Sequence, residues 1–336
     1  MITLRKADGS DGVGPARYIA FDDTAAPEQD LDPAKWVAQI IKPLRARPAK
    51  PVGPSGQTGD ILFFVHGFNV SHQAARDSHV QVARSLTAVG WTGTVVSYDW
   101  PSDGLVFAYL PDRDNARAAA STLVSAGIAL LEAQQTPDCT INLHVMAHSM
   151  GGFVTQQAFA WAYQDVAPVW AVAQLLFVAA DVDRSVFGAD NYSAKMFGQH
   201  AGRLTAYCNR YDKALLASNA KRLELAPRMG RVGLPADAPP MMCEVDCSGL
   251  FDKVDPGLLD KLSPVTTHCF YFSRPEFWRD VALTLAGGLD RNVFPTRTTA
   301  PPPAVANRFD LIAAGISDQD YQTALARAAV TPSVQL

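Results

Sequence analysis

The chain has 336 residues, of which 48% are hydrophobic and 18% charged, and its net charge is −4 at pH 7. This length and composition are typical of one large α/β domain with extensions, or at most of two domains. The sequence has no stripe of lysine and arginine, which disfavours a nucleic-acid partner. No apolar run approaches the roughly 20 residues that a membrane span needs, and residues 1–8 lack the apolar region of a signal peptide, so we expect a cytoplasmic protein.

The first 57 residues predict an N-terminal extension. Residues 16–21 are typical of a strand, and residues 33–44 of a helix that begins after Asp32 with a proline at its first position. Residues 48–59 are rich in proline and glycine and favour a linker. We therefore expect the main domain to begin near residue 58 and to end near residue 290.

Strands and helices alternate through residues 58–290. Strands are expected at 61–65, 94–99, 141–147, 172–180, 203–208 and 241–246. Helices are expected at 71–88, 112–134, 151–163 and 275–285. This alternation predicts an α/β fold with a mostly parallel, doubly wound sheet that carries helices on both faces. Functional residues should then lie where the strands end.

The most informative segment is Val145 to Gly152. A β-forming run ends at Ser149, two glycines follow, and residues 153–160 are typical of a helix. A serine between strand and helix indicates a nucleophile elbow, whose strained turn exposes the hydroxyl. Strand and helix pass close together there, so the residues two before and two after the serine must be small, as Ala147 and Gly151 are. The alternative for this segment alone is an ordinary turn with a serine cap.

Two further polar segments also follow buried strands. The apolar run 61–65 ends in His66-Gly67-Phe68-Asn69, where we expect His66 to bond to backbone in the loop rather than to act as a base. Asp212 lies just past the strand 203–208, a place from which a carboxylate can orient a catalytic histidine. Asp181 has a similar place after the strand 172–180 and is the alternative acid, although we favour Asp212.

His268 is the candidate base. It follows Asp212 in the chain and lies in a predicted loop, Ser263 to His268, which leads to the helix 275–285. An imidazole in this role takes the serine proton and returns it to the leaving group, so it needs a partner that fixes its tautomer. Without Ser149 and Asp212 the same residue would be interpreted as an ordinary surface histidine.

Together these segments resemble the α/β-hydrolase superfamily, and more narrowly a poorly characterised bacterial branch of esterase- and lipase-like serine hydrolases. The resemblance covers about residues 58–290 and is carried by residues 63–69, 98–102, 147–152, 209–215 and His268. Ala147 departs from the family pattern, which usually has glycine at that place.

The resemblance implies a Ser149–His268–Asp212 triad and an oxyanion hole made by the backbone N–H groups of Phe68 and Met150. It implies hydrolysis of a small-molecule carboxylic ester through an acyl-enzyme, with no metal and no cofactor. We favour an esterase for small or medium acyl groups. A lipase, thioesterase, amidase or acyltransferase remains open, as does a non-catalytic hydrolase-like binding protein, and the oligomeric state is not predicted.

Two other stretches bear on the surroundings of this site, and a third extends the chain beyond the main domain. The apolar residues 105–110 either contact an acyl chain or pack against the next helix, and residues 223–240 are candidates for part of a lid. Residues 291–336 predict a proline- and alanine-rich extension with a short helix that begins after Ser317.

Overall fold

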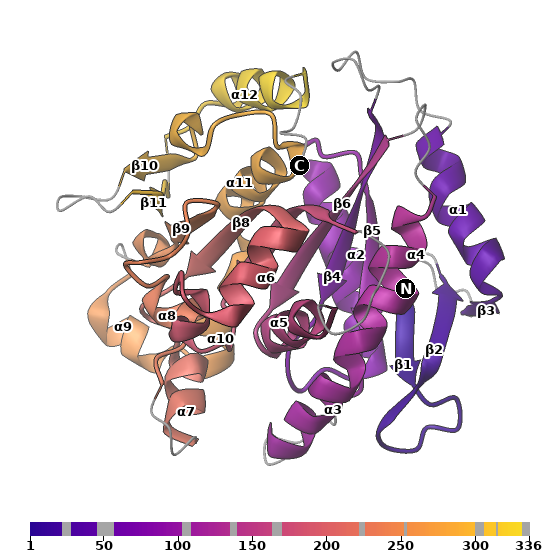
Figure 1. Cartoon of the computed structure of the whole chain (residues 1–336). Coiled ribbons are helices and arrows are strands. Elements are labelled where there is room, and N and C mark those ends of the chain that lie inside the picture. The colour runs from indigo at the N-terminus through magenta and orange to yellow at the C-terminus, as the bar shows by residue number, and fades with distance from the viewer. Residues whose placement is uncertain are drawn as a thin grey trace.

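The computed structural model describes residues 1–21, 28–45, 57–102, 109–134, 140–162, 170–221, 226–251, 254–299, 306–313 and 315–330. Its centre is a sheet of 11 strands with helices on both faces (Figure 1). The strands are β1 (Ile2–Arg5), β2 (Val13–Ala20), β3 (Gln29–Leu31), β4 (Gln57–Val65), β5 (Thr94–Asp99), β6 (Thr140–His148), β7 (Val172–Val178), β8 (Ala201–Cys208), β9 (Met242–Asp246), β10 (Arg297–Thr299) and β11 (Arg308–Leu311).

The sheet is mostly parallel, as the alternation of strands and helices predicts. Its order is β10-β11-β9-β8-β7-β6-β4-β5-β1-β2-β3, and every pair from β11 to β1 is parallel. Only the pairs β1–β2, β2–β3 and β10–β11 are antiparallel. The carboxyl ends of β4 to β8 therefore meet at one edge of the sheet, where an α/β fold places its ligands.

Helices cover both faces of the sheet. One face carries α1 (Pro33–Arg45), α3 (Tyr109–Thr122), α5 (Met150–Ala162) and α6 (Tyr192–His200), and the other carries α2 (His72–Ala88), α11 (Pro275–Ala286) and α12 (Asp318–Val330). The shorter helices are α4 (Ala129–Glu132), α7 (Lys213–Lys221), α8 (Met229–Val232), α9 (Pro256–Lys261) and α10 (Pro264–Cys269).

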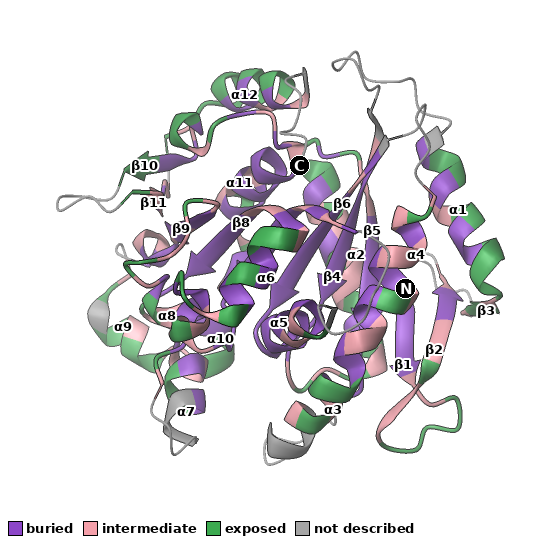
Figure 2. Ribbon diagram, in the orientation of Figure 1, coloured by how far each residue is buried: buried purple, intermediate pink, exposed green. Residues whose placement is uncertain are grey.

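Strand β4 shows why a hydrophobic core lies on each face of the sheet. Successive side chains of a strand point to opposite faces. Ile61, Phe63 and Val65 accordingly join the core beneath α3 and α5, whereas Leu62 and Phe64 join the core beneath α2 and α11. The central strands β4 to β8 are mostly buried, and the outer helices alternate buried and exposed residues (Figure 2).

Both flanks of the chain add strands to this sheet. The N-terminal residues Ile2–Arg5 pair in parallel with β5, and β11 pairs in parallel with β9. The sequence analysis did not anticipate these strands, because segments of four residues are too short for a hydrophobic period and depend on pairing with a distant strand. The expected helix 112–134 is also different. The structure divides it into three consecutive segments, which are α3, a π-helical segment at Leu123–Ile128, and α4.

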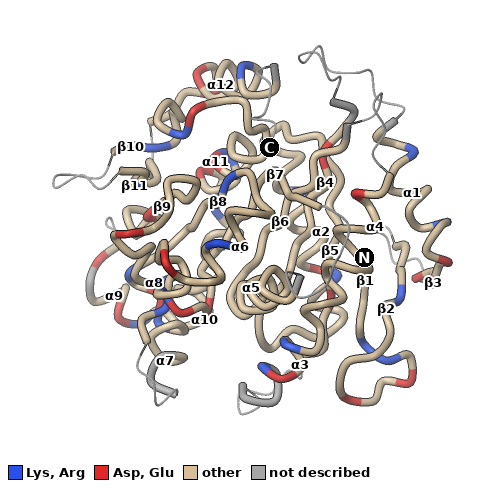
Figure 3. The backbone as a smooth tube through the Cα atoms, in the orientation of Figure 1, with Lys and Arg blue, Asp and Glu red and all other residues tan. Residues whose placement is uncertain are grey.

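Lysine and arginine positions interleave with aspartate and glutamate positions along the backbone (Figure 3). Among the described residues, no helix combines the length and apolar character that crossing a membrane requires. The apolar residues 105–108, the proline run 301–303 and most of the predicted linker 48–59 lie outside the described residues.

Candidate active site

The elbow forms where the sequence analysis places it. Ser149 lies between β6 and α5 with φ at 56°, a left-handed conformation that is costly for a residue with a Cβ. Neighbouring segments hold it there. Its N–H donates to the carbonyl of Val178 at 3.1 Å, and its own carbonyl accepts from the N–H of Asp181 at 2.9 Å. The strained turn is therefore fixed by the end of β7.

Two glycines let the chain close around Ser149. A Cβ on Gly151 would lie 2.3 Å from the carbonyl oxygen of Val65, so the start of α5 can approach β4 only without a side chain. A Cβ on Gly67 would lie 2.7 Å from the Cβ of Ser149 and 3.2 Å from its Oγ. The backbone after β4 thus packs directly against the serine side chain.

Asp212 and His268 are in contact. Nδ1 of His268 lies 2.6 Å from Oδ2 of Asp212, a carboxylate that is fully buried. The loop predicted around His268 is wrong, because the residue lies in α10. Ser263 caps that helix by accepting from the N–H of Thr266 at 3.0 Å, and proline occupies its first turn. The imidazole therefore stands on a short rigid helix.

The ring of His268 faces the elbow. It lies against the ring of His148, the residue before Ser149, with 4.8 Å between ring centroids. Nε2 of His268 makes no hydrogen bond to any residue that the structure describes, and Oγ of Ser149 makes none to the imidazole. The structure thus brings the expected acid and base together and places the base beside the elbow, with its second ring nitrogen free.

His148 is a neighbour that the sequence analysis did not single out. Its ring packs edge-on against Phe272 at 4.9 Å, and burial together with the nearby His268 lowers its pKa well below the usual range. It therefore stays neutral beside His268. Its place directly before Ser149 is the only signal in the sequence that could have identified it.

The loop after β4 is bound to the end of β5. His66 directs Nδ1 at the carbonyl of Gly67 (2.9 Å) and Nε2 at the carboxylate of Asp99 (3.1 Å), and its ring stacks on Trp100. Met150 begins α5, and the first N–H groups of a helix have no acceptor within it. Phe68 is partly buried one residue beyond Gly67. Both expected oxyanion donors thus lie in segments adjacent to Ser149.

With this geometry in view, the chain can be compared with known proteins. Residues 54–281 match the family described as alpha/beta hydrolase of unknown function (DUF900). The protein belongs to this α/β-hydrolase family. No protein with a curated description matches the sequence.

Several solved structures resemble this hydrolase weakly. A hyperthermophilic esterase from the archaeon Pyrobaculum calidifontis is 13% identical, with 60% of this chain and 69% of that chain covered and a TM-score of 0.29. A hormone-sensitive lipase from a metagenome library is 16% identical, with 74% and 92% covered and a TM-score of 0.29. A lipase-esterase related protein from Clostridium acetobutylicum is 15% identical, with 45% and 74% covered and a TM-score of 0.23. At these scores the likeness carries no inference about activity.

The alternative acid of the hydrolase, Asp181, has other partners. Its carboxylate accepts from the hydroxyl of Ser218 at 2.9 Å and lies 3.4 Å from Nε of the buried Arg228. The N–H of Met229 donates to Val182, which fixes this part of the expected lid residues 223–240 to the segment after β7. Asp181 therefore holds a neighbouring segment, and His268 is bonded to Asp212 instead.

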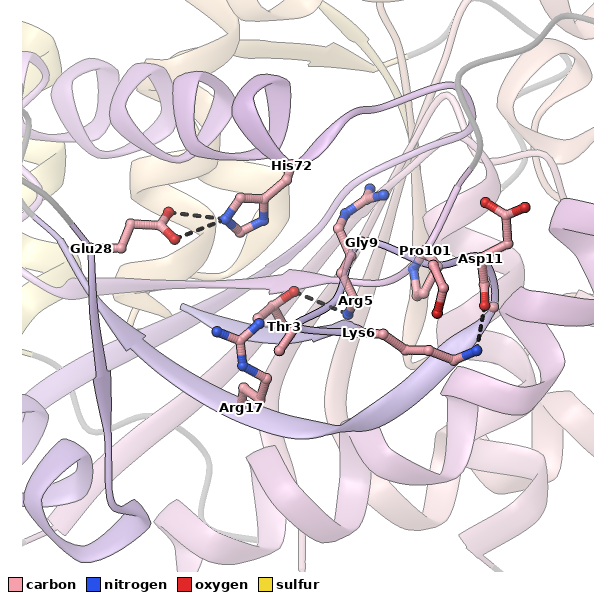
Figure 4. Close-up of a pocket in the computed structure, with 12 residues that line it drawn as sticks. Thr3, Arg5, Lys6, Gly9, Asp11, Arg17, Glu28, His72 and Pro101 are labelled. Carbon is pink, nitrogen blue, oxygen red and sulfur yellow. Dashed lines mark hydrogen bonds and ion pairs between the residues drawn. The ribbon is translucent and has the colours of Figure 1, made fainter.

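The hydrolase also has a hollow away from Ser149. It has a volume of about 320 Å³ and opens beside the β1–β2 hairpin (Figure 4). Its lining is mostly polar and comprises Thr3, Arg5, Lys6, Ala7, Gly9, Ser10, Asp11, Gly12, Arg17, Glu28, His72 and Pro101. Neither Ser149 nor His268 lines it, so we do not assign it to the substrate.

Proposed function

We propose that the protein hydrolyses carboxylic esters through an acyl-enzyme on Ser149. His268, oriented by Asp212, takes the proton from the Ser149 hydroxyl as its oxygen attacks the ester carbonyl. The backbone N–H groups of Phe68 and Met150 stabilise the oxyanion. His268 then protonates the departing alcohol, and a water molecule activated by the same imidazole releases the acid.

One observation carries the proposal: the 2.6 Å contact between His268 and Asp212 beside a serine in left-handed conformation. The carboxylate fixes the tautomer with a proton on Nδ1, which leaves Nε2 as the proton acceptor. The strained turn supports the assignment of Ser149, since elbows of this kind expose the nucleophile at the end of a strand.

Oγ of Ser149 makes no hydrogen bond to His268 in the structure, which is consistent with this role. Catalytic hydrogen bonds are often long or absent without substrate and shorten only when the complex forms. Rotation of the serine side chain or a small shift of α10 changes this distance without changing the Asp212 contact.

The burial of Ser149 and His268 favours small or medium acyl groups. Ser149 and His268 are each only 8% exposed, so a bulky ester has little direct access to the hydroxyl. Lipase, thioesterase, amidase and acyltransferase activities use the same triad and differ in pocket shape and water access, which makes them the alternatives.

A panel of p-nitrophenyl esters of increasing acyl length tests the proposal. We expect turnover that is highest with short chains and that disappears in Ser149→Ala. Ser193→Ala is the matched control, because Ser193 is also buried but bonds Gln156 away from the site. Turnover that survives in Ser149→Ala, or folded wild-type protein without turnover on any ester of the panel, would contradict the proposal.

A further inference from the structure

The segment Tyr98 to Ser102 carries part of the family resemblance, yet the proposed triad does not use it. In the structure Asp99, Trp100 and Ser102 bond to the loop 66–70, which holds the expected oxyanion donor Phe68. We infer that Asp99, together with Arg5, is a positioning residue that clamps this loop against Ser149. This inference rests on the proposed function.

The buried carboxylate of Asp99 accepts hydrogen bonds from several side chains. Its carboxylate is fully buried and accepts from Thr3 Oγ1 at 2.8 Å and from Arg5 Nε at 2.9 Å. It also faces His66 Nε2 at 3.1 Å and His72 Nδ1 at 2.6 Å. Burial alone would favour the neutral acid, but the hydrogen bonds from the two histidines hold the pKa of Asp99 well below its usual range. The group is therefore a fixed anion.

The first end of the loop is held through His66. Its ring joins Asp99 to the carbonyl of Gly67, and Trp100 donates from Nε1 to the carbonyl of His66 at 2.9 Å. Gly67 is the residue in contact with the Ser149 side chain. A shift of His66 is therefore passed on to the backbone that touches the nucleophile.

The second end of the loop is held at Val70. Nη2 of Arg5 donates to the Val70 carbonyl at 2.5 Å, and Ser102 accepts from the Val70 N–H at 3.0 Å. Arg5 also bonds Asp99, so the two ends of the loop share one ion pair. Phe68 lies between the two held ends, next to Asn69, which has φ at 60°.

This arrangement gives the N-terminal extension a part in the active site. Thr3 and Arg5 belong to β1, and they reach Asp99 because β1 pairs in parallel with β5 with Thr3 opposite Asp99. Oxyanion donors act by preorganisation, so a loop that is held less firmly stabilises the transition state less and leaves ground-state binding nearly unchanged.

Asp99→Asn tests the inference, with Asp280→Asn as the matched control. Asp280 is likewise fully buried and accepts from several side chains, including Arg297 at 2.7 Å, but it lies on α11. We expect Asp99→Asn to lower kcat roughly tenfold to a hundredfold with KM within about twofold, below the effect of losing a whole oxyanion donor. Asp280→Asn should lower thermal stability while kcat stays near the wild-type value.

The decisive readout is inhibition by a trifluoromethyl ketone, which forms a tetrahedral adduct on serine and needs the oxyanion donors. Its Ki should rise by the same factor by which kcat/KM falls in Asp99→Asn. Trp100→Phe, which removes only the donor to His66, should give a smaller change of the same kind if Asp99→Asn folds poorly.

Equal kcat and Ki in folded Asp99→Asn and wild type would overturn the inference, as would equal kinetic losses in Asp99→Asn and Asp280→Asn. Failure of the proposed function itself is distinguishable, because in that case Ser149→Ala retains turnover.

Discussion

Two buried carboxylates at the same edge of the sheet, Asp99 and Asp212, make the same contact with a histidine. Each lies 2.6 Å from the Nδ1 of its partner, which is His72 for Asp99 and His268 for Asp212. Both carboxylates are fully buried; Asp99 is the last residue of the parallel strand β5, and Asp212 comes four residues after the parallel strand β8. By these criteria alone either pair is a candidate for a catalytic acid and base.

The second ring nitrogen separates the two pairs. Nε2 of His72 is 2.9 Å from the carboxylate of Glu28 (Figure 4), so both of its nitrogens face acceptors. The hydrogen bond to Asp99 raises the pKa of His72. Nε2 of His268 has no hydrogen bond to a described residue, and the ring lies against that of His148, the residue before Ser149. The difference teaches that a histidine–aspartate pair becomes a base only where the other nitrogen is free and a nucleophile is near.

The largest expected effect is from removing the free nitrogen. We expect His268→Ala to lower kcat by roughly four orders of magnitude or more, as losing the base of a triad does. His72→Ala should lower kcat at most about tenfold, since it removes only one of the hydrogen bonds to the positioning residue Asp99. Steady-state rates on a short-chain ester check both. Similar losses in the two variants would remove the distinction drawn here.

The next effect separates Asp212 from Asp181. Asp212→Asn leaves an amide that stabilises the wrong tautomer of His268, and we expect kcat to fall by roughly 10³ to 10⁴. Asp181→Asn should change kcat only a few-fold, because that carboxylate bonds Ser218. Circular dichroism is the check that both variants are folded. If only Asp181→Asn abolished turnover, the acid would be misassigned.

A smaller effect is expected at the contact between the loop and the nucleophile. The Cβ of Gly67→Ala would push against Ser149, so we expect kcat to fall by up to about 10², comparable to the loss of an oxyanion donor. Gly198→Ala is the control, because a Cβ there meets no atom within 4 Å. Unchanged turnover in Gly67→Ala would show that the loop tolerates displacement.

The smallest effect is a change in stability with pH. The pKa of His72 is raised in the folded state, so its contribution is fully present below the unfolded value of about 6.5 and is lost as pH rises through the folded pKa. The titratable and charged groups around His72 are Asp99, Glu28, Arg5, Arg76, His66 and the amino group of Met1.

Urea unfolding of wild type and His72→Gln between about pH 6 and pH 9 measures this contribution. The difference in unfolding free energy should be largest at the acid end and should shrink as pH rises. A difference that does not vary with pH would mean that His72 contributes through packing alone.

Much of the fold follows from local sequence signals. The runs that form β4, β6 and β7 are buried on both faces and have turn residues at their ends. Ser149 and its glycines indicate the elbow in the sequence, and hydrogen bonds to Val178 and Asp181 hold it in the structure. The place of Asp212 after a strand and the position of His268 later in the chain predict this pair, and the structure shows the two residues in contact across 56 residues of sequence. The tetrahedral chemistry that joins them to Ser149 stays a proposal.

What the sequence did not reveal depends on pairing between distant segments. Thr3 and Arg5 gain their partners only because β1 adds to the edge of β5, and nothing near residue 3 or 5 indicates that. His268 was assigned to a loop because α10 is shorter than two turns and carries no hydrophobic period, although Ser263 and Pro264 form a recognisable helix start.

The most direct test of the account is the site of covalent labelling by a fluorophosphonate. Tryptic mapping of the labelled protein should find one adduct, on the peptide that contains Ser149, and labelling should be absent in Ser149→Ala and strongly slowed in His268→Ala. An adduct on another residue, or correctly folded wild-type protein that takes up no label, would contradict the assignment of Ser149 as a nucleophile activated by His268.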